Sequence, residues 1–188
     1  MILRQAQDKQ KFMGKALITG ITGFAGSHLT DYLLSKGYKV SGTYITDDSR
    51  GNLGQKEKCT LHKVNLLDEE KTFDLIQDEK PEYIFHLAAL TATRDSFNNP
   101  KETFVNNICA QINLLEAVKK TGLTDSRILI VSSAEVYGLV APENIPIDED
   151  TPFNPTNPYS VSKIAQDYLG LQYFLSDKLK IIRVRPFN

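Results

Sequence analysis

A turn with three evenly spaced glycines constrains this chain more than any other feature. The apolar run Ala16–Ile18 predicts a buried strand, and Gly20, Gly23 and Gly26 follow it at intervals of three residues. Leucines then recur at helical spacing over residues 29–34. A strand, a glycine turn and a helix in this order offer unpaired N–H groups and a partial positive charge to an anion. The stretch therefore predicts a phosphate-binding turn, with an ordinary strand-to-helix turn as the alternative.

The rest of the chain predicts a parallel sheet. Apolar or β-branched runs alternate with helical patterns, which is typical of crossover connections and a doubly wound Rossmann-type fold. The predicted strands are 16–18, 39–45, 59–64, 83–87, 127–131 and 180–184, and the predicted later helices are 68–78, 101–121 and 158–176. We expect residues 1–14 to form a flexible leader and residues 15–188 to form one dinucleotide-binding domain, a length sufficient for a single core.

The composition excludes several functional classes. The net charge of −1 provides no basic surface for nucleic acid, and no apolar run approaches the ~18 residues of a membrane span. Cys59 and Cys109 are too few for a disulfide framework, and His28, His62 and His86 do not have metal-ligand spacing. We therefore expect no metal, nucleic-acid or membrane partner, and a cytoplasmic location.

A tyrosine and a lysine provide the candidate chemistry. Tyr159 and Lys163 lie four residues apart on a helix that Asn157 and Pro158 are predicted to cap and begin, so both project from one face. A neighbouring ammonium stabilises the phenolate of a tyrosine, whose free pKa is about 10. Such a tyrosine can act as a general base toward a substrate hydroxyl, with the hydroxyl of Ser133 bonded to the same oxygen. The alternative is an unrelated surface pair.

Five motifs together resemble the extended short-chain dehydrogenases/reductases, the family of NAD-dependent nucleotide-sugar epimerases and dehydratases. The resemblance runs from about residue 15 to the end and is strongest toward GDP-mannose 4,6-dehydratases and the GDP-4-dehydro-6-deoxymannose reductases. The motifs are Gly20-x-x-Gly23-x-x-Gly26, Leu87-Ala-Ala89, Ser132-Ser-Ala-Glu-Val-Tyr-Gly138, Pro158-Tyr-Ser-Val-Ser-Lys163 and Arg185-Pro-Phe-Asn188.

The resemblance implies roles for individual residues. It makes Ser133, Tyr159 and Lys163 a catalytic triad and Glu135 the base that dehydratases use. The implied substrate contacts are Thr91, Ser133, Glu135 and Asn188, while Asn107 is expected to be structural. The implied cofactor is NAD or NADP, bound by Gly20, Thr22, Gly23, Phe24, Ala25, Gly26, Asp47, Asn65, Leu66, Leu87, Ala88, Ala89, Tyr159 and Lys163.

Three departures from the family pattern bear on function. Asn65 stands where many relatives have an aspartate near adenine, and its amide can still bond the base. Ala134 stands where dTDP-glucose dehydratases have an acid, which argues against that branch. Relatives continue past Asn188 into a smaller substrate domain, so the chain is expected to be truncated.

The residues after the second predicted strand bear on the choice of cofactor. Asp47 and Asp48 favour NAD and Arg50 favours NADP, so the choice stays open.

We therefore expect a redox-neutral nucleotide-sugar 4,6-dehydratase, with GDP-mannose as the expected substrate. The alternatives are a GDP-4-dehydro-6-deoxymannose reductase, a nucleotide-sugar 4-epimerase, and a cofactor-binding fragment without turnover. The resemblance also implies a homodimer or higher homo-oligomer formed by paired helices. The residues expected on the outer helix faces are Phe104, Tyr168, Leu171 and Tyr173.

Overall fold

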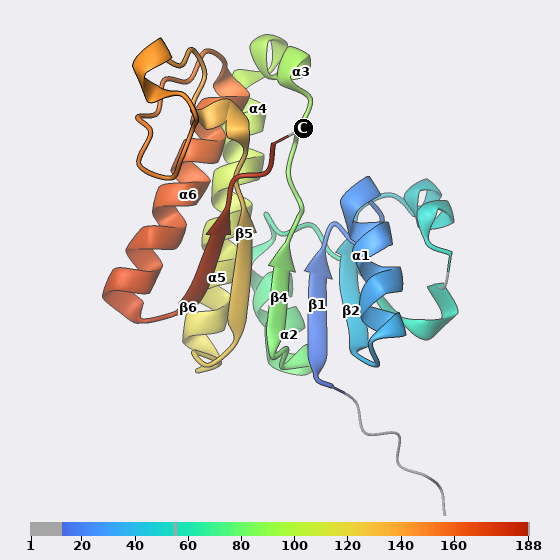
Figure 1. Ribbon diagram of the computed structural model, residues 1–188. Helices are drawn as coiled ribbons and strands as arrows, with labels where there is room; N and C mark the ends of the chain where they lie inside the picture. The colour runs from blue at the N-terminus through green and yellow to red at the C-terminus, as the bar shows by residue number, and fades with distance from the viewer. Residues whose placement is uncertain (1–12, 55, 188) are drawn as a thin grey trace, which may run out of the picture.

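Six parallel strands form one sheet in a computed structural model that describes residues 13–54 and 56–187. The strands are β1 (Lys15–Thr19), β2 (Lys39–Tyr44), β3 (Thr60–Lys63), β4 (Tyr83–His86), β5 (Arg127–Val131) and β6 (Lys180–Val184). Their order is β3-β2-β1-β4-β5-β6, the order of a Rossmann sheet. Figure 1 shows β2, β1, β4, β5 and β6 side by side in this order. The predicted fold class is confirmed. Most of the predicted leader, and Asn188, lie outside the described residues.

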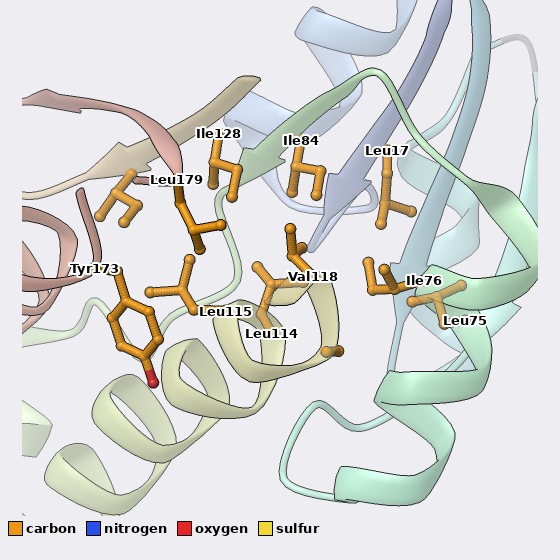
Figure 2. Packing of buried hydrophobic residues seen from close by; sticks show 12 residues of the cluster. Leu17, Leu75, Ile76, Ile84, Leu114, Leu115, Val118, Ile128, Tyr173 and Leu179 are labelled. Carbon is orange, nitrogen blue, oxygen red and sulfur yellow. The ribbon is translucent and has the colours of Figure 1, made fainter. Parts of the chain in front are cut away.

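Helices cover both faces of the sheet. They are α1 (Phe24–Ser35), α2 (Glu69–Glu79), α3 (Thr93–Asn98), α4 (Pro100–Phe104), α5 (Ala110–Lys120) and α6 (Pro158–Asp177). Successive strand residues point to opposite faces, and the core divides accordingly. Leu17 of β1 belongs to a cluster with residues of α2, α5 and α6 (Figure 2), whereas Ile18 belongs to a second cluster with Leu33 of α1.

The region between β4 and β5 differs from the sequence prediction in two ways. Helix α3 forms where a loop was expected, and the predicted single helix 101–121 contains a π-helical turn, Val105–Cys109, between α4 and α5. A π-turn winds more widely than an α-turn, so it shifts which side chains face inward. The buried face accordingly carries Asn107 and Gln111, whereas Ile108 and Ile112 are half-buried.

All six strands run in the same direction, so their carboxyl ends meet at one edge of the sheet. The glycine turn follows β1 at this edge, and the segment containing Ser133 follows β5. Among the described residues, no helix combines the length and apolar character needed to cross a membrane.

Candidate functional site

The glycine turn is built by close backbone contacts. Gly20 has φ +69°, and a Cβ there would lie 3.0 Å from the Cα of Ala88. A Cβ at Gly26 would lie 2.4 Å from the carbonyl oxygen of Gly20, so neither position accepts a side chain without movement. Gly23 is the N-cap of α1, and α1 has neither a side-chain cap nor an acidic residue in its first turn. The turn therefore presents helix N–H groups to an anion, which fits a pyrophosphate.

A cavity of about 220 Å³ lies beside this turn. Six of the predicted cofactor residues line it, namely Gly20, Thr22, Asn65, Leu66, Ala88 and Ala89. Sequence reasoning missed Thr46 and Ser49 after β2, and Asn106 from the π-turn. The residues after β2 could have been found because a cofactor lies across strand ends, whereas Asn106 is brought there by the unpredicted turn. The cavity's place at the strand ends fits the adenosine part of a dinucleotide.

Asp47 lies in a cluster of charges after β2. Its carboxylate bonds the Lys63 ammonium at 2.5 Å and lies 3.6 Å from the Arg50 guanidinium. The hydrogen bond from Lys63 contributes most to the lowering of the pKa of Asp47. The acidic and basic candidates for cofactor selection therefore contact each other, and this geometry favours neither NAD nor NADP.

Tyr159 and Lys163 are both buried on the first turns of α6, with exposed fractions of 7% and 4%. The Lys163 Nζ donates to the Val131 carbonyl at 2.8 Å and to the Gln166 Oε1 at 2.7 Å. It lies 5.9 Å from the centre of the Tyr159 ring. Burial lowers the pKa of Lys163 to about 8. The sequence thus placed both residues on one face, while the contact with Gln166 was not predicted.

The environment of Tyr159 differs from the sequence expectation in its electrostatics. Burial raises the pKa of Tyr159, the Ser133 hydroxyl opposes this, and the charge of Glu135 adds to it. The pKa is therefore raised overall rather than lowered, and Tyr159 is a protonated phenol at neutral pH. A phenol in this state donates a proton more readily than it accepts one.

Glu135 is held by side chains from two other segments. Thr93 Oγ1 donates to Glu135 Oε1 at 3.1 Å, and Asn157 Nδ2 donates to Oε2 at 2.9 Å. Asn157 also caps α6, because its Oδ1 accepts from the Ser160 N–H at 2.7 Å. We call Thr93, Ser133, Glu135, Asn157 and Tyr159 the Glu135 corner.

A hollow of about 430 Å³ opens at the Glu135 corner and is lined by Ser133, Glu135, Leu139, Thr156 and Phe187. It has room for a sugar-sized group beside Glu135. Thr91, the predicted substrate contact, is exposed in the loop that precedes Thr93. Asn188, the other, lies outside the described residues.

Three buried residues, Thr19, His86 and Asn107, support the site. Thr19 Oγ1 accepts from the N–H groups of Leu87 and Ala88, so its own proton goes to the Nδ1 of His86. Burial lowers the pKa of His86 to about 3, so His86 is neutral. Asn107 Oδ1 accepts from the Leu90 N–H and its Nδ2 donates to the Leu90 carbonyl, which fixes the loop after β4. These bonds agree with the structural role expected for Asn107.

Comparison with known proteins places this geometry in a family. Residues 17–188 match the family described as GDP-mannose 4,6 dehydratase. The GDP-6-deoxy-D-mannose reductase of Pseudomonas aeruginosa is 32% identical over 174 residues, which cover 93% of this chain and 52% of that protein. The GDP-mannose 4,6-dehydratase of Yersinia enterocolitica is 35% identical over 173 residues, covering 86% and 46%.

A solved structure shows a similar fold. The UDP-glucose 4-epimerase of Thermus thermophilus, in complex with NAD, matches with a TM-score of 0.82 at 28% identity, covering 91% of this chain and 54% of that one. The chain spans about half the length of the curated relatives it matches. The match over residues 17–188 confirms the resemblance inferred from the five motifs: the chain belongs to the GDP-mannose 4,6 dehydratase family.

Proposed function

We propose that this chain forms the cofactor-binding and catalytic half of a nucleotide-sugar 4,6-dehydratase acting on GDP-mannose in the cytoplasm. The observation that carries the proposal is the position of Glu135. Its carboxylate is held by Thr93 and Asn157 and lines the hollow, and its negative charge raises the pKa of Tyr159. A second base beside the triad is what elimination of water requires. The family match and the Yersinia enterocolitica relative support the same reaction.

The proposed cofactor is NAD or NADP. The glycine turn would hold the pyrophosphate, and the cavity beside it would hold the adenosine part. Lys163 has one ammonium proton left after its bonds to Val131 and Gln166, and this proton would bond a hydroxyl of the nicotinamide ribose. When bound, the nicotinamide would take a hydride from sugar C4 and return it at C6.

The protein's own groups would move the protons. Because its surroundings raise the pKa of Tyr159, the phenol must first lose its proton. As the phenolate it would then take the proton of the C4 hydroxyl while Ser133 bonds the same oxygen. The resulting 4-ketone makes the C5 proton acidic. Glu135 removes that proton and passes it to the departing C6 hydroxyl, which leaves as water. The proton that Tyr159 took from the C4 hydroxyl returns to C5 when C6 receives the hydride. The net change is the loss of one water, so the cofactor ends as it began.

Substitution of Glu135 by glutamine tests this assignment in the full-length protein. Glutamine keeps the shape and removes the base, so formation of the 6-deoxy-4-keto sugar should fall by about 10²–10⁴-fold. Oxidation at C4 does not need Glu135, so reduced cofactor should accumulate in a single turnover. Wild-type product formation by Glu135→Gln would contradict the dehydratase assignment.

A reductase is the second candidate. The Pseudomonas aeruginosa relative is a GDP-6-deoxy-D-mannose reductase, and the raised pKa of Tyr159 suits a phenol that donates a proton to a ketone. A reductase consumes one reduced nicotinamide per turnover, so cofactor stoichiometry separates it from a dehydratase. An epimerase would return the hydride to C4, and a fragment that only binds cofactor would show neither reaction.

We also propose that the chain forms a homodimer or a higher homo-oligomer. Tyr168, Phe174 and Leu175 are exposed along α6, and Val105 is exposed on the π-turn before α5. Tyr173, expected on the outer face, is buried in the core because α6 turns that side toward α5. Light scattering well above micromolar concentration should give twice the monomer mass or more, and charged replacements at Tyr168 and Phe174 should give the monomer mass.

A further inference from the structure

We propose that Gln166 is a positioning residue that fixes the Lys163 ammonium and keeps it charged within the site. Gln166 lies three residues after Lys163 on α6 and is 1% exposed. Its Oε1 accepts a hydrogen bond of 2.7 Å from the Lys163 Nζ, shorter than the bond from the same atom to the Val131 carbonyl. The proposal rests on the proposed function only for the role of Lys163 in catalysis.

Buried polar contacts hold this pair in place. The Gln166 carbonyl accepts from the Nε2 of Gln111, which is fully buried on α5. The Lys163 carbonyl accepts from the Ser132 hydroxyl, just after β5. Lys163 and Gln166 are thus tied to α5 and to the β5 end, and Gln166 fixes the direction in which the ammonium points.

The groups around Lys163 explain why a neutral hydrogen-bond acceptor such as Gln166 contributes to the stability of the ammonium. Among the described residues, Lys163 makes no salt bridge, and burial lowers its pKa to about 8. The groups nearby do not supply a counter-charge to the ammonium. His86 on β4 is neutral, Tyr159 is protonated, and Asp167 on α6 is bound to Arg183 and Arg185. Within the part of the chain that the structure describes, Gln166 therefore supplies the side-chain oxygen that accepts a hydrogen bond from the ammonium.

A titration of the Lys163 Nζ by NMR tests this in the chain labelled with ¹⁵N-lysine, without cofactor or substrate. Lys163→Arg assigns the signal. A hydrogen bond to a charged group favours the charged form, so Gln166→Leu should lower the titration midpoint by about one pH unit or more. Gln166→Glu adds a negative charge and should raise the midpoint. Side-chain packing alone would not shift the midpoint in opposite directions.

Gln111→Leu is the matched control, because Gln111 is equally buried and its side chain does not bond Lys163. Because Gln111 bonds only the main-chain carbonyl of Gln166, Gln111→Leu removes no hydrogen bond from the ammonium, and its midpoint should move much less than that of Gln166→Leu. If Gln166→Leu folds and titrates like the control, the proposal is wrong. If Gln166→Leu does not fold, Gln166→Glu decides, and an unchanged midpoint there overturns the proposal. Because the titration needs no turnover, its result is independent of the Glu135→Gln experiment.

Discussion

The glycine turn and the Glu135 corner lie at the same edge of the sheet but are built in opposite ways. The turn is one short segment between β1 and α1, and its shape comes from backbone atoms packed against backbone atoms. The corner is assembled from side chains of α3, the segment after β5, and the start of α6. A side chain at Gly20 or Gly26 should therefore affect fold and binding together, whereas a change at the corner should affect individual contacts.

The largest effect is expected from Gly26→Val. A Cβ there would lie 2.4 Å from the Gly20 carbonyl oxygen and 2.8 Å from that of Ile21, so the turn must open. We expect a loss of about 3 kcal/mol or more in the free energy of unfolding, and loss of dinucleotide binding. Urea unfolding and calorimetry with NAD and NADP measure the two effects.

Gly23→Asp separates the two effects, because a Cβ at Gly23 meets only the Gly20 carbonyl oxygen, at 3.3 Å. This variant should fold, but its carboxylate would repel a pyrophosphate at the start of α1. Wild-type affinity in both glycine variants would exclude the turn as the cofactor site.

The same contrast explains what could be predicted from sequence. The turn and the strands are formed by contiguous residues, so the three glycines and apolar runs such as 127–131 predict them from the sequence alone. Asn157 was predictable as a helix cap, but its bond to Glu135 depends on how two distant segments meet. Thr93 lies on a short helix without a sequence signal. The sequence gives no signal that distinguishes Gln166 from other helical residues. Its role depends on the fold, which buries it beside Lys163.

A medium effect is expected at Asn157, which serves both the helix and the corner. Asn157→Ala removes the cap of α6 and should lower the free energy of unfolding by about 1 kcal/mol. Asn157→Ser keeps a capping oxygen but is too short to hold Glu135, so its stability should stay within about 0.5 kcal/mol of the wild type. Urea unfolding of both variants measures the difference. Equal losses would mean that the cap contributes little here.

The smallest expected effect tests whether Glu135 and Ser133 interact electrostatically with Tyr159 in the Glu135 corner. The charge of Glu135 raises the pKa of Tyr159, and the Ser133 hydroxyl lowers it. Glu135→Gln should therefore lower the titration midpoint of Tyr159, and Ser133→Ala should raise it, each by a fraction of a pH unit because burial contributes most. Tyrosinate absorbance, with Tyr159→Phe subtracted, measures both shifts. Opposite signs are required, since a general loosening of the site would admit water and lower the midpoint in both variants. Two shifts of the same sign would mean that Glu135 and Ser133 change the pKa of Tyr159 only through packing. The proposed electrostatic interaction between the Glu135 carboxylate and the Tyr159 phenol would then be wrong.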